Sequence, residues 1–115
     1  MATPIYFCNM SGLLKQALDR FFSFFVPDYV TAPVPSRLPA GMDFVLIQTQ
    51  GEGAERYGDL LDQYGPALDK MGFANRHLIR AAGVRERGDV LQHLSALAQA
   101  DQLARALSQA QGARH

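Results

Sequence analysis

The stretch that decides the fold is Thr3-Pro4-Ile5-Tyr6-Phe7-Cys8-Asn9-Met10-Ser11-Gly12, which runs directly into an amphipathic segment from Leu13 to Phe25. A short apolar run, a polar turn and a helix start follow one another in this order. The arrangement places exposed backbone groups at a helix N-terminus, where α/β proteins hold anionic or electron-rich ligands. Asn9 or Ser11 can cap the helix by accepting a hydrogen bond from a backbone N–H.

Composition limits the protein to one ordinary globular domain. The chain has 115 residues, of which 48% are hydrophobic and 19% are charged. The 11 Lys and Arg residues balance 11 Asp and Glu residues, so no general field favours nucleic acid or an anionic membrane. The single cysteine, Cys8, excludes an internal disulfide framework. No segment approaches the roughly 20 apolar residues that cross a bilayer, and no signal-peptide pattern is present, so we expect a cytoplasmic protein.

Apolar periodicity predicts alternating helices and strands. The expected order is helix, strand, helix, strand, helix, over the segments 14–25, 44–49, 57–71, 73–84 and 89–107. Gly65-Pro66 predicts a break in the second helix, and Asp89 with Gln92 has the spacing of a capping box. Because the run Phe44–Ile47 predicts a strand buried on both faces, the alternation favours an α/β fold with right-handed parallel crossovers.

Three further stretches accompany the opening one. They are Leu18-Asp19-Arg20-Phe21, then Thr49-Gln50-Gly51-Glu52-Gly53, and finally Gly83-Val84 followed by Gly88-Asp89-Val90. With the opening stretch, they resemble successive parts of the flavodoxin-like NAD(P)H-dependent FMN reductases. These parts are the flavin-contacting loop T-P-x-Y-x-x-x-M/V-S-G after strand three, the helix L-K-x-x-L-D-R-F/W, the second flavin loop T-x-G-G, and the ending after strand five.

The resemblance implies a three-layer flavodoxin-like α/β fold of strand order 2-1-3-4-5, truncated here to a short parallel sheet with flanking helices. Residues 1–115 would form a single partial domain of this kind. The implied function is that of an FMN-dependent oxidoreductase, with FMN as cofactor and NAD(P)H as co-substrate. Residues implied to lie against the isoalloxazine are Pro4, Tyr6, Asn9, Met10 and Ser11, with Thr49, Gly51 and Gly53 at its other edge. No catalytic acid or base is identified.

The family's N-terminal half would be absent from this chain. That half includes the Ser/Thr-rich phosphate loop, strands one and two, and most of strand three. Phe44–Thr49 would then be an apolar sheet edge with open N–H and C=O groups. We therefore expect a homo-oligomer, or a fragment whose complementing N-terminal half lies elsewhere. The alternative function is a cofactor-free oligomeric or interaction module derived from the same fold.

The remaining candidate groups have simpler interpretations. Helical spacing favours a core or interface role over flavin stacking for Phe21, Phe22, Phe24 and Phe25. A helix N-terminus lowers a thiol pKa, but no base accompanies Cys8, so a passive residue is favoured. No metal site is expected, because the histidines lack metal-ligand spacing. A solvated charged turn is favoured over a nicotinamide phosphate contact for Arg85-Glu86-Arg87.

Overall fold

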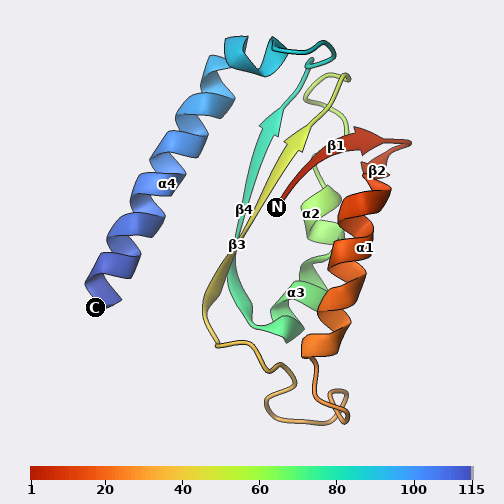
Figure 1. Ribbon diagram of the computed structural model, residues 1–115, viewed down its shortest axis with the longest axis vertical. Helices are drawn as coiled ribbons and strands as arrows, with labels where there is room; N and C mark the ends of the chain where they lie inside the picture. The colour runs from red at the N-terminus through yellow and green to blue at the C-terminus, as the bar shows by residue number, and fades with distance from the viewer. Residues whose placement is uncertain (115) are drawn as a thin grey trace.

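A four-stranded sheet with flanking helices forms the centre of the computed structural model, which describes residues 1–114 (Figure 1). Its strands, in the order β2-β1-β3-β4, are β1 (Ala2–Tyr6), β2 (Asn9–Met10), β3 (Met42–Thr49) and β4 (Phe73–Ala81). β1 and β4 both pair with β3 in parallel, whereas β2 folds back antiparallel to β1. The carboxyl ends of the three parallel strands therefore meet at one end of the sheet.

Helices flank the sheet on both sides (Figure 1). On one side lie α1 (Gly12–Arg20), α2 (Leu60–Gln63) and α3 (Gly65–Met71), and on the other lies α4 (Leu94–Arg114). Two 3-10 turns, η1 (Phe21–Phe24) and η2 (Asp89–Gln92), follow α1 and precede α4. The molecule is thus a mixed α/β fold, as the alternating pattern predicts. Among the described residues, no helix has the length and apolar character needed to cross a membrane.

The expectation that β3 is an open sheet edge is wrong. Residues at the start of the chain form β1, which pairs with the second half of β3 from Ala2↔Ile47 to Pro4↔Thr49. The Met1 amino group also donates to the Val45 carbonyl at 2.8 Å. β3 consequently lies between β1 and β4, and its backbone groups from Val45 onward have hydrogen-bonding partners on both edges.

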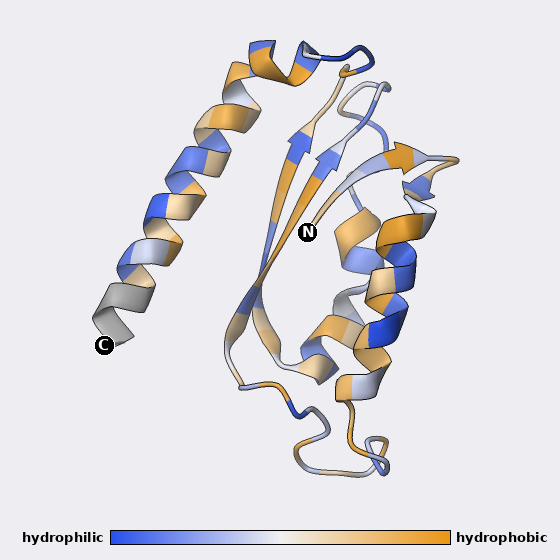
Figure 2. Ribbon diagram, viewed as in Figure 1, coloured by the Kyte–Doolittle hydropathy of each residue, from blue (hydrophilic) through white to orange (hydrophobic). Residues whose placement is uncertain are grey.

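The two faces of β3 are buried unequally. The main core lies on the α1–α3 side, where Leu46 is 2% exposed. A smaller core lies under α4, around Ile79, Ala81 and Ala96, and there Ile47 remains 39% exposed. The prediction that β3 is buried on both faces is therefore confirmed only for the face toward α1–α3. The other face of β3 stays partly exposed because α4 packs over β4 (Figure 1). Figure 2 shows β3 as apolar along most of its length and polar at its carboxyl end, whereas β4 carries polar residues in its first half as well as near its carboxyl end.

The helix boundaries follow local backbone chemistry. Ser11 caps α1, its Oγ accepting from the Leu14 N–H at 3.3 Å. The expected break at Gly65-Pro66 is present, with Tyr64 between α2 and α3 and the proline in the first turn, where a missing N–H costs no hydrogen bond. α3 ends at Gly72, whose φ of 105° suits a residue without a Cβ.

The expected capping box at the last helix does not form. The Asp89 carboxylate accepts from the backbone N–H groups of Arg85 and Glu86, at 3.0 and 2.8 Å, and so closes the preceding loop. Residues Asp89–Gln92 form a 3-10 turn, and α4 begins only at Leu94. Its first turn is capped by His93, whose Nδ1 accepts from the Ala96 N–H at 3.3 Å.

Candidate functional site

A small cleft lies at the end of the sheet where the parallel strands finish. Its volume is about 140 Å³, and one wall comes from the β1–β2 turn and the other from the loop after β3. The lining residues are Ile5, Phe7, Cys8, Gln50, Gly51, Glu52 and Tyr57. Crevices outside the carboxyl ends of parallel strands are the usual ligand sites of open α/β sheets. The cleft is therefore the first candidate for a binding site.

Backbone strain is concentrated at this cleft. Within residues 1–114, the non-glycine residues with positive φ are Phe7 (48°), Cys8 (67°) and Tyr57 (62°), and all three line the cleft. Such conformations cost of order 1–3 kcal/mol each and persist where the surroundings determine them strongly. Because such strained residues cluster at functional sites, their position in both walls supports the cleft as a candidate site.

The two walls meet through one side-chain contact. The Cys8 Sγ and the Tyr57 Oη lie 3.3 Å apart and share a hydrogen bond. That bond is the main reason why the pKa of Tyr57 is raised above 10.0, with partial burial adding to the effect. The phenol is therefore neutral at physiological pH and can donate or accept a hydrogen bond at the mouth of the cleft.

Two buried glutamines hold the loop after β3. The Gln48 Nε2 donates to the Gln50 Oε1 at 2.8 Å and to the Tyr57 carbonyl at 3.0 Å. The Gln50 Nε2 donates to the carbonyls of Gly53 and Arg56, at 2.8 and 2.9 Å. Gln48 and Gln50 are 0% and 2% exposed, so these bonds are shielded from water. The glutamines thus fix the path of the chain from Gly53 to Tyr57.

The loop after β4 also contacts the loop after β3, at Gln50 and Gly51. The Arg85 Nε donates to the Gly51 carbonyl at 3.1 Å, and a Cβ on Gly51 would meet the arginine Cγ at 3.2 Å. The Val84 N–H donates to the Gln50 carbonyl at 2.9 Å. Two backbone N–H bonds, from Glu86 and Arg85, lower the pKa of Asp89 below 3.8 and keep its carboxylate charged in this loop.

The residues expected around a flavin lie in and near this end of the sheet, but only Gly51 lines the cleft. Tyr6 is 61% exposed at the end of β1, whereas the Met10 side chain is buried in the core. The hydroxyl of Ser11 is used for capping, and the Gly53 carbonyl accepts from Gln50. Pro4, Asn9 and Thr49 also lie near the strand ends. Pro4 is exposed, and Thr49 is half-buried beside it. The Asn9 Oδ1 accepts from the Tyr64 hydroxyl at 3.2 Å.

Sequence reasoning missed most of the cleft walls. The helical spacing predicts a helix that begins at Tyr57, and no motif gives Phe7 or Gln50 a role of its own. The available signal was the alternation of Gln48 and Gln50 at the end of an apolar strand, which puts two amides on one buried face. Buried amides need partners, and the following glycine-containing loop is the nearest source of carbonyl groups.

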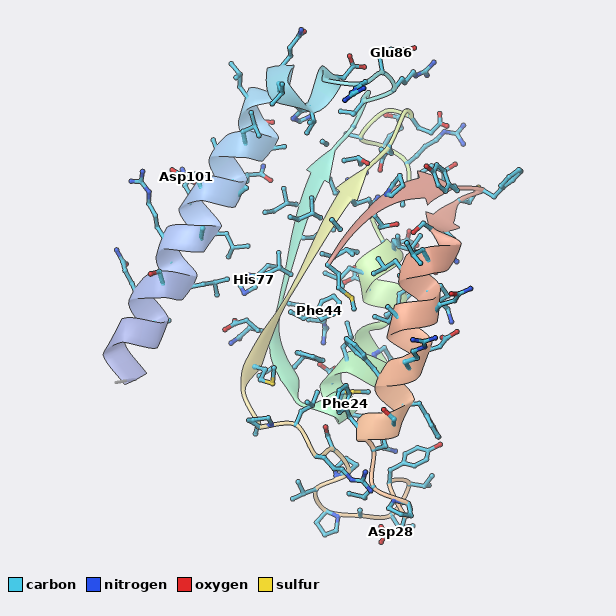
Figure 3. All side chains as sticks on the ribbon, viewed as in Figure 1. Phe24, Asp28, Phe44, His77, Glu86 and Asp101 are labelled. Carbon is cyan, nitrogen blue, oxygen red and sulfur yellow. The ribbon has the colours of Figure 1, made fainter. Side chains whose placement is uncertain are left out.

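The other candidate groups lie away from the cleft. His77, which has no metal-ligand spacing in the sequence, lies between the sheet and α4 (Figure 3), and its Nε2 is 3.1 Å from the Asp43 Oδ1 on the neighbouring strand β3. Phe21 and Phe25 pack against the main core, whereas Phe22 is 59% exposed. Over residues 1–114, no group of three or more His, Cys, Asp or Glu side chains is placed to hold a metal ion.

Comparisons with protein-family models, with curated proteins and with solved structures find no match to this chain.

Proposed function

We propose that the chain is a flavin-binding module with a flavodoxin-like arrangement, in which the cleft at the strand ends takes the edge of the isoalloxazine ring of FMN. On this proposal the protein takes part in two-electron transfer between NAD(P)H and an acceptor. The observation that carries the proposal is the gathering of all three strained residues at one cleft beside the ends of parallel strands.

The arrangement of the sheet supports the fold part of this proposal. The sheet has three parallel strands in chain order with helices on both sides, and on this proposal they would correspond to strands three, four and five of the expected 2-1-3-4-5 order. β1, β3 and β4 would be these strands. The β1–β2 turn and the Gln50–Tyr57 loop would then be the two flavin loops.

The cleft walls suit a planar, electron-rich ring. Tyr57 offers aromatic surface at one wall, and Phe7 lines the cleft from the β1–β2 turn with its side chain fully exposed. The Tyr57 hydroxyl is positioned to hydrogen-bond a ring heteroatom. When bound, the flavin supplies the hydride chemistry, and these residues supply orientation and polarity. None of the lining residues is basic and Glu52 is acidic, so the walls favour the uncharged ring over a phosphate group.

The test is a titration of the purified protein with lumiflavin, riboflavin and FMN, followed by flavin absorbance and fluorescence. We expect all three to bind with similar affinity, since the ring alone makes the contacts. Tyr57→Ala should weaken binding at least tenfold, and the matched variant Tyr29→Ala, outside the cleft, should not. Absence of binding by any flavin refutes the proposal.

A second candidate function is that of an interaction module. Residues 1–14 carry no charged side chain, and within them Tyr6, Phe7 and Leu13 are 61%, 103% and 81% exposed. α1 has no buried residue, although Leu14 and Leu18 pack against the core. Interfaces are depleted of charge and enriched in aromatic residues, so this corner fits a second copy or a complementing chain. Leu13→Glu should lower the mass measured by sedimentation if a complex forms here, whereas an unchanged mass in wild type and variant removes this candidate.

A further inference from the structure

β4 forms an outer edge of the sheet. Its pairing is with β3, and in the order β2-β1-β3-β4 the described residues place no strand on its other side. Its 9 residues, FANRHLIRA, include no proline, and the one irregularity of its pairing with β3 lies at Ala74, near the start of the strand. From Asn75 onward, the outward backbone N–H and C=O groups can therefore accept another strand.

A groove runs along this edge, with α4 as its second wall. The cavity has a volume of about 550 Å³ and is lined by the consecutive residues Arg76–Ile79 and by Gln99, Gln102 and Leu103 of α4. Since consecutive strand residues point to opposite faces, the groove follows the strand edge and does not lie over one face. Figure 1 shows α4 beside β4, and Figure 3 shows His77 between the sheet and this helix.

The charges at this edge select the kind of occupant. Arg76 and Arg80 point to one face of the sheet, where the Arg80 guanidinium donates to the carbonyls of Ala54 and Arg56, and β4 carries no acidic residue. A second copy of β4, paired antiparallel about any of residues 77–79, would place these arginines opposite or diagonal to arginines of the copy. Like charges at such positions are destabilising, whereas an acidic side chain there is favourable. Asp69 bonds to Arg76, but it is 62% exposed and can share the guanidinium.

We propose that the groove between β4 and α4 docks an extended acidic segment of another protein, which adds a strand to the sheet. Its backbone pairs with the outer edge of β4, and an acidic side chain faces Arg76. On the opposite face, apolar side chains lie against Leu103, beside the amides of Gln99 and Gln102. Strand addition beside a helix is an established mode of peptide recognition. The proposal does not depend on flavin binding at the cleft.

Blocked, fluorescein-labelled pentapeptides provide the probe, with binding read by fluorescence anisotropy. The sequence E-V-L-V-E places two acids and a leucine on one face and two valines on the other. We expect it to bind about tenfold more tightly than K-V-L-V-K, from two cross-strand charge pairs. Two further versions carry N-methyl groups on alternate amides. One of these versions should lose binding at least tenfold and the other should retain it, because only alternate amides face β4.

Matched protein variants locate the binding. Leu103→Glu places a carboxylate in the groove and should abolish binding of E-V-L-V-E, whereas Ala104→Glu, which makes the same charge change outside the groove, should not. Arg76→Glu should shift the preference toward K-V-L-V-K, a gain that unfolding cannot produce. Equal binding of the acidic and basic peptides, or of both methylated versions, overturns the proposal. So does protection of β4 amides from hydrogen exchange that rises with protein concentration in the absence of peptide, since a second copy would then occupy the edge.

Discussion

Replacement of Gln50 by leucine tests whether the buried amides hold the cleft together. The substitution keeps the volume of a side chain that is 2% exposed and removes its hydrogen bonds to Gln48, Gly53 and Arg56. Each bond contributes about 1 kcal/mol net, which gives an upper figure of about 3 kcal/mol. The full penalty for unpaired groups does not add to this, because the Gly53 carbonyl still accepts from the Arg56 N–H at 3.1 Å. We expect the free energy of unfolding to fall by about 2–3 kcal/mol.

The assay is urea denaturation followed by circular dichroism, with the slope compared between variants to confirm a two-state transition. Gln99→Leu is the control, since this glutamine is exposed on α4 and its replacement should change stability by less than about 0.5 kcal/mol. Amide hydrogen exchange adds a local measurement, in which residues 53–57 should lose protection in Gln50→Leu. If the variant matches the control in urea and keeps its loop protection, the reasoning about the amide network is wrong.

Three further changes have defined outcomes. Leu46→Ala, in the main core, should destabilise the protein by about 3–4 kcal/mol in urea, and Leu13→Ala, at an 81% exposed position, by less than about 0.5. Cys8→Ala should lower the pKa of Tyr57 toward 10.0 in an ultraviolet titration of the tyrosines, because the hydrogen bond that raises it is lost, and an unchanged titration contradicts the assignment. The stability from Asp89 is present above pH 3.8 and disappears as the pH falls through its lowered pKa, so Asp89→Asn should be less stable than wild type at pH 7. That difference should vanish in strong acid, and a constant difference across pH refutes the ionic origin.

The regular elements of the fold could be predicted because their signals are local. A run of apolar residues from Phe44 to Ile47 identified β3, and apolar spacing identified α1 and α4. β1 was missed as a paired strand because it has only 5 residues and includes Pro4, which lacks a backbone donor. Its pairing with β3 depends on residues more than 40 positions away, and no local pattern reports such a contact.

The cleft could be predicted in position but not in detail. Glycines and a helix start marked the strand ends correctly as the place for loops. Tyr57 fits the helical spacing that continues to Leu60 and Leu61, yet the carbonyl of Tyr57 is tied to Gln48 before α2 begins. Apolar periodicity reflects only a residue's neighbours in the chain, whereas the conformation of Tyr57 is decided by a tertiary hydrogen bond. For the same reason, the pair of Asp43 and His77, on separate strands, lay beyond sequence reasoning.

The buried glutamines and the strained walls are two parts of one arrangement. Positive φ at Tyr57 is unfavourable by itself, and the bond from Gln48 to its carbonyl is one of the contacts that oppose relaxation. A loop tied at Gly53, Arg56 and Tyr57 is already ordered before any ligand arrives. Binding in the cleft then loses little conformational entropy on that wall. The opposite wall, at Phe7 and Cys8, is joined to the loop across the cleft by the hydrogen bond between Cys8 and Tyr57. Ordering that depends on a ligand should therefore be sought first in the β1–β2 turn.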